Sequence, residues 1–328
     1  MSGALVRAGE DVGDYIVGGF RDRRLALVGG LLFKRICEGL TVCIKSLALN
    51  RASEVAFGRF LGNTRVTTTA ISEELARKTN AICSGKEHVL CVQDTVQLTY
   101  PTQPVKKEAF GPTGDSNTKG LFLHPGLIVD AENKDVLGMS SATCWCRSDD
   151  KIDPSKKRTI EEKESIRWID TAMKAKSRIT EPKMLTVIGD RESDIFEVFD
   201  RVPDARTHLI VRASHDRHLK SDERISGDLN GVESAGIHPI DLQRITGRRD
   251  ARIAELRIKY STIEFEQKSS NSTVKVNCVS AVETSSTVPE GEKPISWVLL
   301  TTHAVESFED AVQILTWYRW RWVIEQVF

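Results

Sequence analysis

The sequence lacks several features that would place it in a special class of proteins. No apolar run reaches the roughly 18 residues that a membrane-spanning helix needs, and the first residues show no secretion-signal pattern. There is no internal repeat and no long low-complexity segment. We therefore expect no membrane contact, and we expect an intracellular, cytoplasmic protein of globular type.

Paired cysteines are also missing. The seven cysteines are scattered, odd in number and without a Cys-x-x-Cys pair, which is typical of free thiols in a reducing compartment. Cys144 and Cys146 would lie on the same face of a strand, but two thiols alone make a poor zinc site. We expect them to be structural.

An excess of charge of either sign is absent, because 46 Lys and Arg balance 46 Asp and Glu. Non-specific nucleic-acid binders are usually basic, so this balance argues mildly against that class. It does not exclude a protein whose charges are segregated. The length of 328 residues and the hydrophobic content of 40% suit one large domain with a smaller one.

Hydrophobic patterning divides the chain into a helical first part and an α/β remainder. Helical spacing and stop signals predict three short helices within residues 20–80, forming a small bundle with basic edges. Short apolar runs predict buried strands from residue 86 onward. These strands are expected at 88–92, 121–129, 136–145, 184–189, 208–213 and 295–300, with helices near 159–177 and 193–201.

Three polar segments interrupt this pattern. Residues 101–120 are rich in turn-forming residues and predict a mobile loop, and residues 147–158 predict a linker. Residues 214–250 show no clear period. The alternation over residues 251–284 predicts an antiparallel hairpin inserted into the α/β domain.

The last stretch, Trp317–Glu325, is predicted to form one helix. A helix turns 100° per residue, so Tyr318, Arg321 and Glu325 would share one face. A phenol, a guanidinium and a carboxylate on one face suggest a functional surface. The alternative is an Arg–Glu pair at i, i+4 that only supports the helix.

Two aspartates stand at the ends of predicted strands. Asp94 and Asp190 each follow an apolar strand, and ligands of open α/β sheets sit outside the carboxyl ends of the strands. With Glu325 they would form a carboxylate cluster suited to Mg²⁺ or Mn²⁺, and such clusters hold two ions. Either aspartate alone could simply favour a turn.

Three motifs carry a resemblance to a known family. They are Val92-Gln93-Asp94-Thr95, the stretch Ile188–Ile195 containing Asp190, and a Tyr-x-x-Arg-x-x-x-Glu pattern over residues 318–325. With these motifs the chain resembles bacterial insertion-sequence transposases of the IS-four class, which are DDE cut-and-paste enzymes. Residues 20–24, Arg59 and Asn63 also look like the DNA-binding region of that family.

The resemblance implies a fold class and a domain order. It implies an α/β protein with a ribonuclease H-like mixed-sheet core, a β-rich insertion and a small N-terminal helical domain. The expected domains are 1–80 for DNA binding, 81–213 and 295–328 for the catalytic core, and 214–294 for the insertion. The chain stops three residues after Glu325, so the dimerisation region that family members carry beyond this point is expected to be absent.

The resemblance also implies site residues. Asp94, Asp190 and Glu325 would bind two Mg²⁺ or Mn²⁺ ions, while Tyr318 and Arg321 would contact the DNA backbone near the scissile phosphate. The further DNA-binding residues that it implies are Arg23, Arg24, Arg59, Asn63, Arg212 and Trp297. Trp297 would stack on a flipped base, or it could be a core or edge-strand aromatic. Arg212 could be an ordinary surface residue.

The implied function is DNA transposition. Water would nick one strand at a transposon end, and the freed 3′-hydroxyl would attack the opposite strand to form a hairpin. A second water would open the hairpin, and the regenerated 3′-hydroxyl would then attack target DNA. The partners would be double-stranded terminal repeats, target DNA and a second subunit, in a bacterial cytoplasm and on the nucleoid. Two alternatives remain open: a non-catalytic transposon-end binder or transposition inhibitor, and a plain ribonuclease H-like nuclease.

Overall fold

The computed structural model describes residue 20 and residues 22–99, 110–113, 118–148, 158–244, 250–267 and 271–328. The chain divides into two compact units, Met1–Lys78 and Thr79–Phe328. The predicted loop at 101–120 and the predicted linker at 147–158 lie largely outside the described residues. No helix in the described part of the chain is long and apolar enough to cross a membrane.

The smaller unit is helical, as expected. Its helices are α1 (Arg23–Gly39), α2 (Ile44–Leu47), α3 (Arg51–Leu61) and the start of α4 (Thr68–Ile82). Asp22 caps α1, and Asn50 with Ser53 forms a capping box at α3. The short α2 was not predicted, because four residues give no readable period. A cluster that includes Phe57 and Phe60 forms the core of this unit.

The larger unit is built on one mixed sheet, which has 11 strands in the described residues. They are β1 (His88–Gln93), β2 (Val96–Thr99), β3 (Gly111–Pro112), β4 (Lys119–Asp130), β5 (Val136–Trp145), β6 (Met184–Gly189), β7 (Thr207–Arg212), β8 (Gly236–Leu242), β9 (Arg252–Gln267), β10 (Ser272–Glu283) and β11 (Ser296–Thr301). Their order is β2-β4-β1-β6-β7-β11-β10-β9-β8, with β3 and β5 also paired to β4. The expected mixed α/β class is confirmed.

Only the pairs in the middle of this sheet are parallel. β1 pairs in parallel with β6, and β6 pairs in parallel with β7, whereas the other pairings are antiparallel. The predicted hairpin is present as β9 and β10, and it continues the same sheet through β11. The segment without a clear period contains a short helix, α7 (Ile225–Gly231), and the strand β8.

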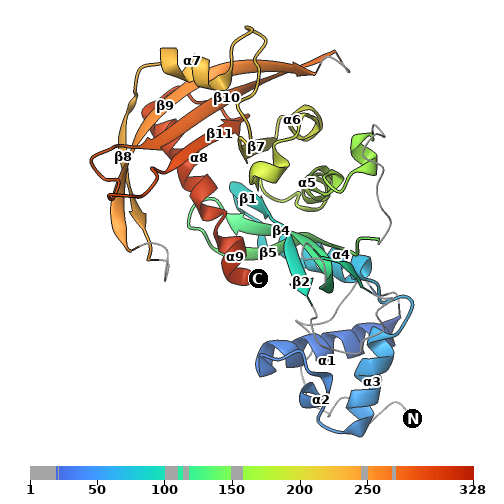
Figure 1. Ribbon diagram of the computed structural model, residues 1–328. Helices are drawn as coiled ribbons and strands as arrows, with labels where there is room; N and C mark the ends of the chain where they lie inside the picture. Colours follow the sequence, from blue (N-terminus) through green and yellow to red (C-terminus); the bar gives the residue numbers. More distant parts are fainter. Residues whose placement is uncertain are drawn as a thin grey trace. The chain divides into compact units, whose positions relative to one another are not determined.

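Helices cover both faces of the sheet (Figure 1). On one face, α5 (Ile166–Arg178), α6 (Phe196–Arg201) and α7 bury apolar side chains that include Trp168 and Phe199. On the other face, α8 (Phe308–Trp320) and α9 (Val323–Val327) bury side chains that include Leu315 and Ile324. The central strands are therefore buried on both sides, which explains why they read as continuous apolar runs.

The prediction of one helix over residues 317–325 is wrong in one respect. The α-helix ends at Trp320 and resumes at Val323, while Arg321 and Trp322 keep right-handed helical angles. The amides of Arg321 and Glu325 bond carbonyl oxygens three residues back, at 3.0 and 3.2 Å. The turn is thus tightened toward 3₁₀ geometry, in which residues three apart eclipse.

Three histidines gather at the sheet edge where β1 begins. Thr186 Oγ1 lies 2.7 Å from the Nε2 atoms of both His88 and His303. The rings of His208 and His303 stack with centroids 4.2 Å apart, and Trp317 packs edge-on against His88. Burial lowers the pKa of His88 to about 4 and that of His303 to about 3. The imidazoles of His88 and His303 are therefore neutral in the folded protein near pH 7.

The histidine cluster predicts a loss of stability in mild acid. The unfolded chain binds protons near the usual pKa of 6.5, whereas folded His88 and His303 stay neutral down to about 4 and 3. The unfolded state binds more protons below pH 6.5, so the free energy of unfolding falls as the pH falls toward 4. The slope is on the order of 1.4 kcal/mol per pH unit for each imidazole. Urea midpoints at pH 7.5 and 5.0 test this, and a slope unchanged by His303→Gln would contradict it.

Candidate active site

Asp94 and Asp190 come to the same edge of the sheet. They follow β1 and β6, which are parallel neighbours, and the last registered pair of these strands is Val92 with Ile188. Each aspartate stands two positions beyond that pair. Because parallel strands share an edge for their carboxyl ends, the two side chains are brought together. Burial raises the pKa of Asp190, and the charge of Asp94 adds to this rise.

Arg321 links Asp94 to Glu325. Its Nη1 donates to Asp94 Oδ2 at 2.7 Å, and its Nη2 donates to Glu325 Oε1 at 3.2 Å. The arginine side chain is only 14% exposed, so these charge-assisted bonds are stronger than an exposed pair would be. The ion pair between Arg321 and Glu325 at i, i+4 is therefore present, as expected from the sequence. The same guanidinium also bonds Asp94, which follows β1.

The carboxyl groups at this edge repel one another. Burial and then the Asp94 charge raise the pKa of Asp190, while the Glu192 amide, which donates to Asp190 Oδ1 at 2.8 Å, and Arg321 oppose the rise. Burial also raises the pKa of Glu325, with the charges of both aspartates adding to it and Arg321 opposing it. The site therefore favours the arrival of positive charge.

The predicted metal centre is not assembled. In the described residues, no group of three or more His, Cys, Asp and Glu side chains is arranged to hold a metal ion. The carboxylate oxygens of Asp94, Asp190 and Glu325 are suitable donors for Mg²⁺. However, the Arg321 guanidinium stands between Asp94 and Glu325 and bonds to both. The donor chemistry fits a hard cation, and the arrangement would have to change to admit one.

A second arginine, Arg167, joins the segments that follow the two strands. Its Nε donates to Thr95 Oγ1 at 3.0 Å, and its Nη2 donates to Glu192 Oε2 at 2.5 Å. Thr95 follows Asp94, and Glu192 lies two residues after Asp190. Sequence reasoning missed Arg167, because it lies within an amphipathic helix with no motif around it.

Thr95 is also held by a buried histidine. Its Oγ1 lies 2.9 Å from Nδ1 of His124, a fully buried residue on β4. Burial and then the nearby Arg167 charge lower the pKa of His124 to about 3. His124 is therefore neutral and contributes a hydrogen bond rather than charge. It fixes Thr95, which in turn holds Arg167.

Tyr318 and Trp297 pack against each other. Their rings are T-shaped with centroids 6.1 Å apart, and both belong to the apolar cluster under α8. Tyr318 is 6% exposed and Trp297 is half-buried. This placement gives Trp297 a packing role, so stacking on a flipped base stays a prediction. The phenol ring of Tyr318 is likewise a core side chain.

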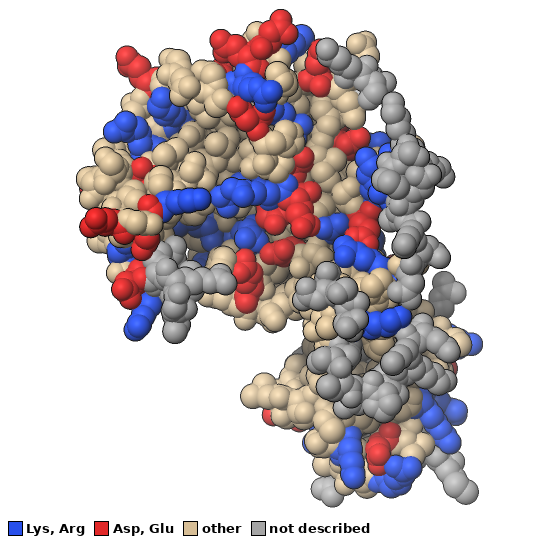
Figure 2. Space-filling view, viewed as in Figure 1, with Lys and Arg blue, Asp and Glu red and all other residues tan. Residues whose placement is uncertain are grey.

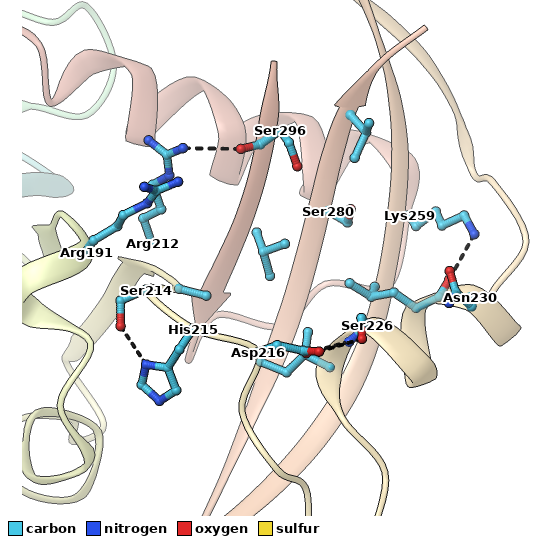
Figure 3. A pocket seen from close by; sticks show the side chains of 15 residues that line it. Arg191, Arg212, Ser214, His215, Asp216, Ser226, Asn230, Lys259, Ser280 and Ser296 are labelled. Atoms are coloured by element: carbon cyan, nitrogen blue, oxygen red, sulfur yellow. Dashed lines mark hydrogen bonds between the residues drawn. The ribbon is translucent and has the colours of Figure 1, made fainter. Parts of the chain in front are cut away.

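Arg212 lines a pocket rather than standing alone on the surface. The pocket has a volume of about 460 Å³ and also takes in Arg191 and Lys259 (Figure 3). Arg212 Nη2 donates to the Ser296 carbonyl oxygen at 3.2 Å. Since Arg191 directly follows Asp190, this basic pocket begins beside the acidic site.

The remaining predicted residues lie in the smaller unit. Arg23, Arg24 and Arg59 are exposed, while Asn63 is half-buried and accepts from the Arg65 amide at 2.9 Å. On the face drawn in Figure 2, basic and acidic side chains are interspersed rather than separated by sign. A role for these four residues in DNA binding stays a prediction.

The contacts of Arg167 predict a measurable effect on stability. We expect Arg167→Ala to lower the free energy of unfolding by roughly 1–3 kcal/mol, because it removes a largely buried guanidinium and leaves the partly buried hydroxyl of Thr95 without its charged partner. The matched control is Arg201→Ala, which breaks the exposed pair with Glu161 at 2.8 Å and should cost about 1 kcal/mol or less. Urea unfolding of both variants checks this, and equal losses would contradict it.

Comparison with known proteins adds a remote likeness. No protein-family model matches the chain. Among solved structures, the chain is similar to the cryo-EM structure of a piggyBac transposase synaptic complex with hairpin DNA, with a TM-score of 0.39 and 9% sequence identity. The alignment covers 92% of this chain and 57% of that chain. A likeness this remote assigns neither a fold family nor an activity to the protein.

Proposed function

We propose that this protein is a DNA transposase of the DDE type, acting by phosphoryl transfer at the edge that carries Asp94 and Asp190. The observation that carries the proposal is the placement of these two aspartates. They stand at equal offsets on adjacent parallel strands, beside a third acid, Glu325, and a nearly buried arginine, Arg321. A purely structural edge has no need for three neighbouring carboxyl groups, two of which, Asp190 and Glu325, have a pKa raised by burial and by the charge of Asp94.

The chemistry of the chain's own residues suits a phosphodiester. Guanidinium groups form bidentate hydrogen bonds to phosphate oxygens. Arg321 would exchange its bond to Asp94 for a bond to the scissile phosphate. It would then oppose the negative charge that develops there. Asp94 and Asp190 would orient the attacking water or 3′-hydroxyl, and Arg167 would keep the two segments in place through Thr95 and Glu192.

Divalent ions belong to this proposal. Two Mg²⁺ or Mn²⁺ ions would supply activation of the attacking oxygen and stabilisation of the leaving oxygen. Asp94, Asp190 and Glu325 would be the residues that hold them. Since Arg321 bonds two of these acids, ion binding would require the arginine to move.

The finer assignment is also a proposal. We assign the protein to the IS-four class with a ribonuclease H-like core, the domains 1–80, 81–213, 214–294 and 295–328, and a bacterial cytoplasmic location. The three motifs support it, as does the position of the β9–β10 hairpin between β6 and α9. The proposed partners are double-stranded terminal repeats, target DNA and a second copy of the chain.

One observation favours a second candidate function. If Arg321 does not leave Asp94 and Glu325, the acids cannot gather around an ion, and the chain would bind DNA without cutting it. The protein would then act as a transposon-end binder or an inhibitor of transposition. The bond of 2.7 Å between Arg321 and Asp94 is the feature that supports this alternative.

A nicking assay separates the two functions. On a duplex carrying the element's own terminal repeat, with Mn²⁺, we expect metal-dependent nicking at the repeat boundary. Asp190→Asn should lower the nicking rate by at least about 100-fold, a loss of roughly 3 kcal/mol of transition-state stabilisation, and spare DNA binding in a gel-shift assay. The matched control Asp170→Asn changes an exposed aspartate on α5 and should nick normally. Normal nicking by Asp190→Asn would refute the assignment.

The position of Arg321 predicts competition with metal ions. Replacing it by Gln removes the positive charge that bonds Asp94 and Glu325. We expect Arg321→Gln to bind Mn²⁺ about 10-fold more tightly than the unaltered chain, measured by electron paramagnetic resonance without DNA. A tighter site would also give a larger rise in melting temperature with added Mn²⁺. Unchanged or weaker binding would show that Arg321 does not compete with the ion.

A further inference from the structure

We propose that the pocket bounded by Arg191, Arg212 and Lys259 binds a two-nucleotide stretch of single-stranded DNA, with one phosphate at each end. This inference rests on the proposed function for the source of the strand and assigns a subsite to it. The pocket lies where β7, β11, β10 and β9 run side by side, and Figure 3 shows Arg191 and Arg212 at one end and Lys259 at the other.

The lining carries an excess of positive charge. The lining contains the basic side chains of Arg191, Arg212 and Lys259 and a single carboxylate, that of Asp216. That carboxylate is engaged by Ser226, whose amide and hydroxyl donate to it at 2.9 and 2.6 Å. The Arg191 side chain has no hydrogen-bond or ion-pair partner in the described part of the chain and is exposed. The arginine end can therefore receive a phosphate without breaking an existing pair.

The separation of the two cationic ends suits two nucleotides. In the sheet register, Arg212 lies opposite Leu299, Leu299 opposite Val279, and Val279 opposite Tyr260. Lys259 is next to Tyr260, so three strand spacings separate the two ends. At about 4.8 Å per strand the backbones are roughly 14 Å apart. That distance exceeds one internucleotide step and matches two steps of an extended strand.

The floor between the ends is suited to nucleosides. It is formed by apolar side chains, mainly Val282, Val298 and Leu229, with the hydroxyls of Ser280 and Ser296 beside them. The described lining contains no Phe, Tyr or Trp, so bases would be held by apolar contact rather than by ring stacking. Such contact tolerates any base sequence, and the volume of about 460 Å³ is within the usual range of ligand pockets.

The pocket is a different place from the predicted stacking position of Trp297. Side chains alternate between the two faces of a strand, and Ser296 and Val298 line the pocket while Trp297 packs under α8 with Tyr318. The pocket thus opens on the face that carries α7.

A buried ion pair fixes one wall of the pocket. Asp194 has a buried side chain and pairs with Arg217. It also accepts from the amide of Ser214 at 2.8 Å and from its hydroxyl at 3.0 Å. Asp194 belongs to the same segment as Asp190 and Arg191. This wall of the pocket is therefore continuous with the segment that carries Asp190. A DNA strand lying in the pocket would lead toward Asp190 and Asp94.

Binding of a defined dinucleotide tests the proposal without metal or cleavage. The probe is thymidine dinucleotide phosphorylated at both its 5′ and its 3′ end, pdTpdTp, compared with dTMP, single-stranded dT12 and a 12-base-pair duplex, in calorimetry or saturation-transfer NMR. We expect pdTpdTp to bind about 10-fold more tightly than dTMP, dT12 to bind at least as tightly as pdTpdTp, and the duplex to compete poorly.

Variants at the two ends and on the floor locate the ligand. Arg191→Gln and Lys259→Gln should each weaken pdTpdTp binding about 5- to 10-fold. Val282→Glu, at a side chain that is 38% exposed, should abolish binding and leave the fold intact. The matched control Lys275→Gln, on β10 outside this pocket, should have no effect. Equal affinity for dTMP and pdTpdTp, preference for the duplex, or an affinity for pdTpdTp that Lys259→Gln does not change would each overturn the two-nucleotide site.

The outcome is separable from that of the nicking assay. Asp190→Asn should leave pdTpdTp binding unchanged, because Asp190 does not line the pocket. If the protein binds pdTpdTp in the expected pattern but never nicks DNA, the pocket assignment stands and the proposed enzyme function is refuted. A chain that nicks normally with Lys259→Gln and shows no dinucleotide binding would retain the function and lose the pocket.

Discussion

The parallel pairing of β1 with β6 is the constraint on which the rest of the site depends. It places Asp94 and Asp190 at the same edge and at the same height, two positions beyond the pair Val92 and Ile188. Side chains alternate along a strand, so a slip of one residue would turn one aspartate to the other face. The buried runs on both strands hold this register, because each must pack against helices on both sides.

Charge is the second constraint. At this partly buried edge, burial and the charge of Asp94 raise the pKa of Asp190 and of Glu325. Such a cluster of acids persists only with positive charge beside it. The chain supplies two arginines with different tasks. Arg321 bonds the acids themselves, whereas Arg167 bonds the neighbours of the two aspartates. Arg321 occupies the carboxylate oxygens that a metal ion would use, whereas Arg167 leaves them free.

The strands of the core were readable from the sequence because burial on both faces produces continuous apolar runs. The ends of those runs located Asp94 and Asp190, and the helical spacing located the Arg321–Glu325 pair. Arg167 was not readable, since its partners are 72 and 25 residues away. The basic pocket could not be predicted from the sequence either, because its lining residues come from several strands and loops that share no regular spacing. For Trp297 the sequence left stacking on DNA and packing in the fold both open; the half-buried indole packs beside Tyr318, and stacking on a base stays a prediction.

The most direct test of the account is to map where a divalent ion binds. Fe²⁺ can replace Mg²⁺, and with peroxide it cuts the polypeptide next to its ligands. The account predicts cuts beside Asp94 and Asp190 when duplex DNA carrying the terminal repeat is present, because the phosphate draws Arg321 away from the acids. Cuts confined to other parts of the chain, or the absence of cutting at both aspartates with DNA bound, would contradict a phosphoryl-transfer site at this edge.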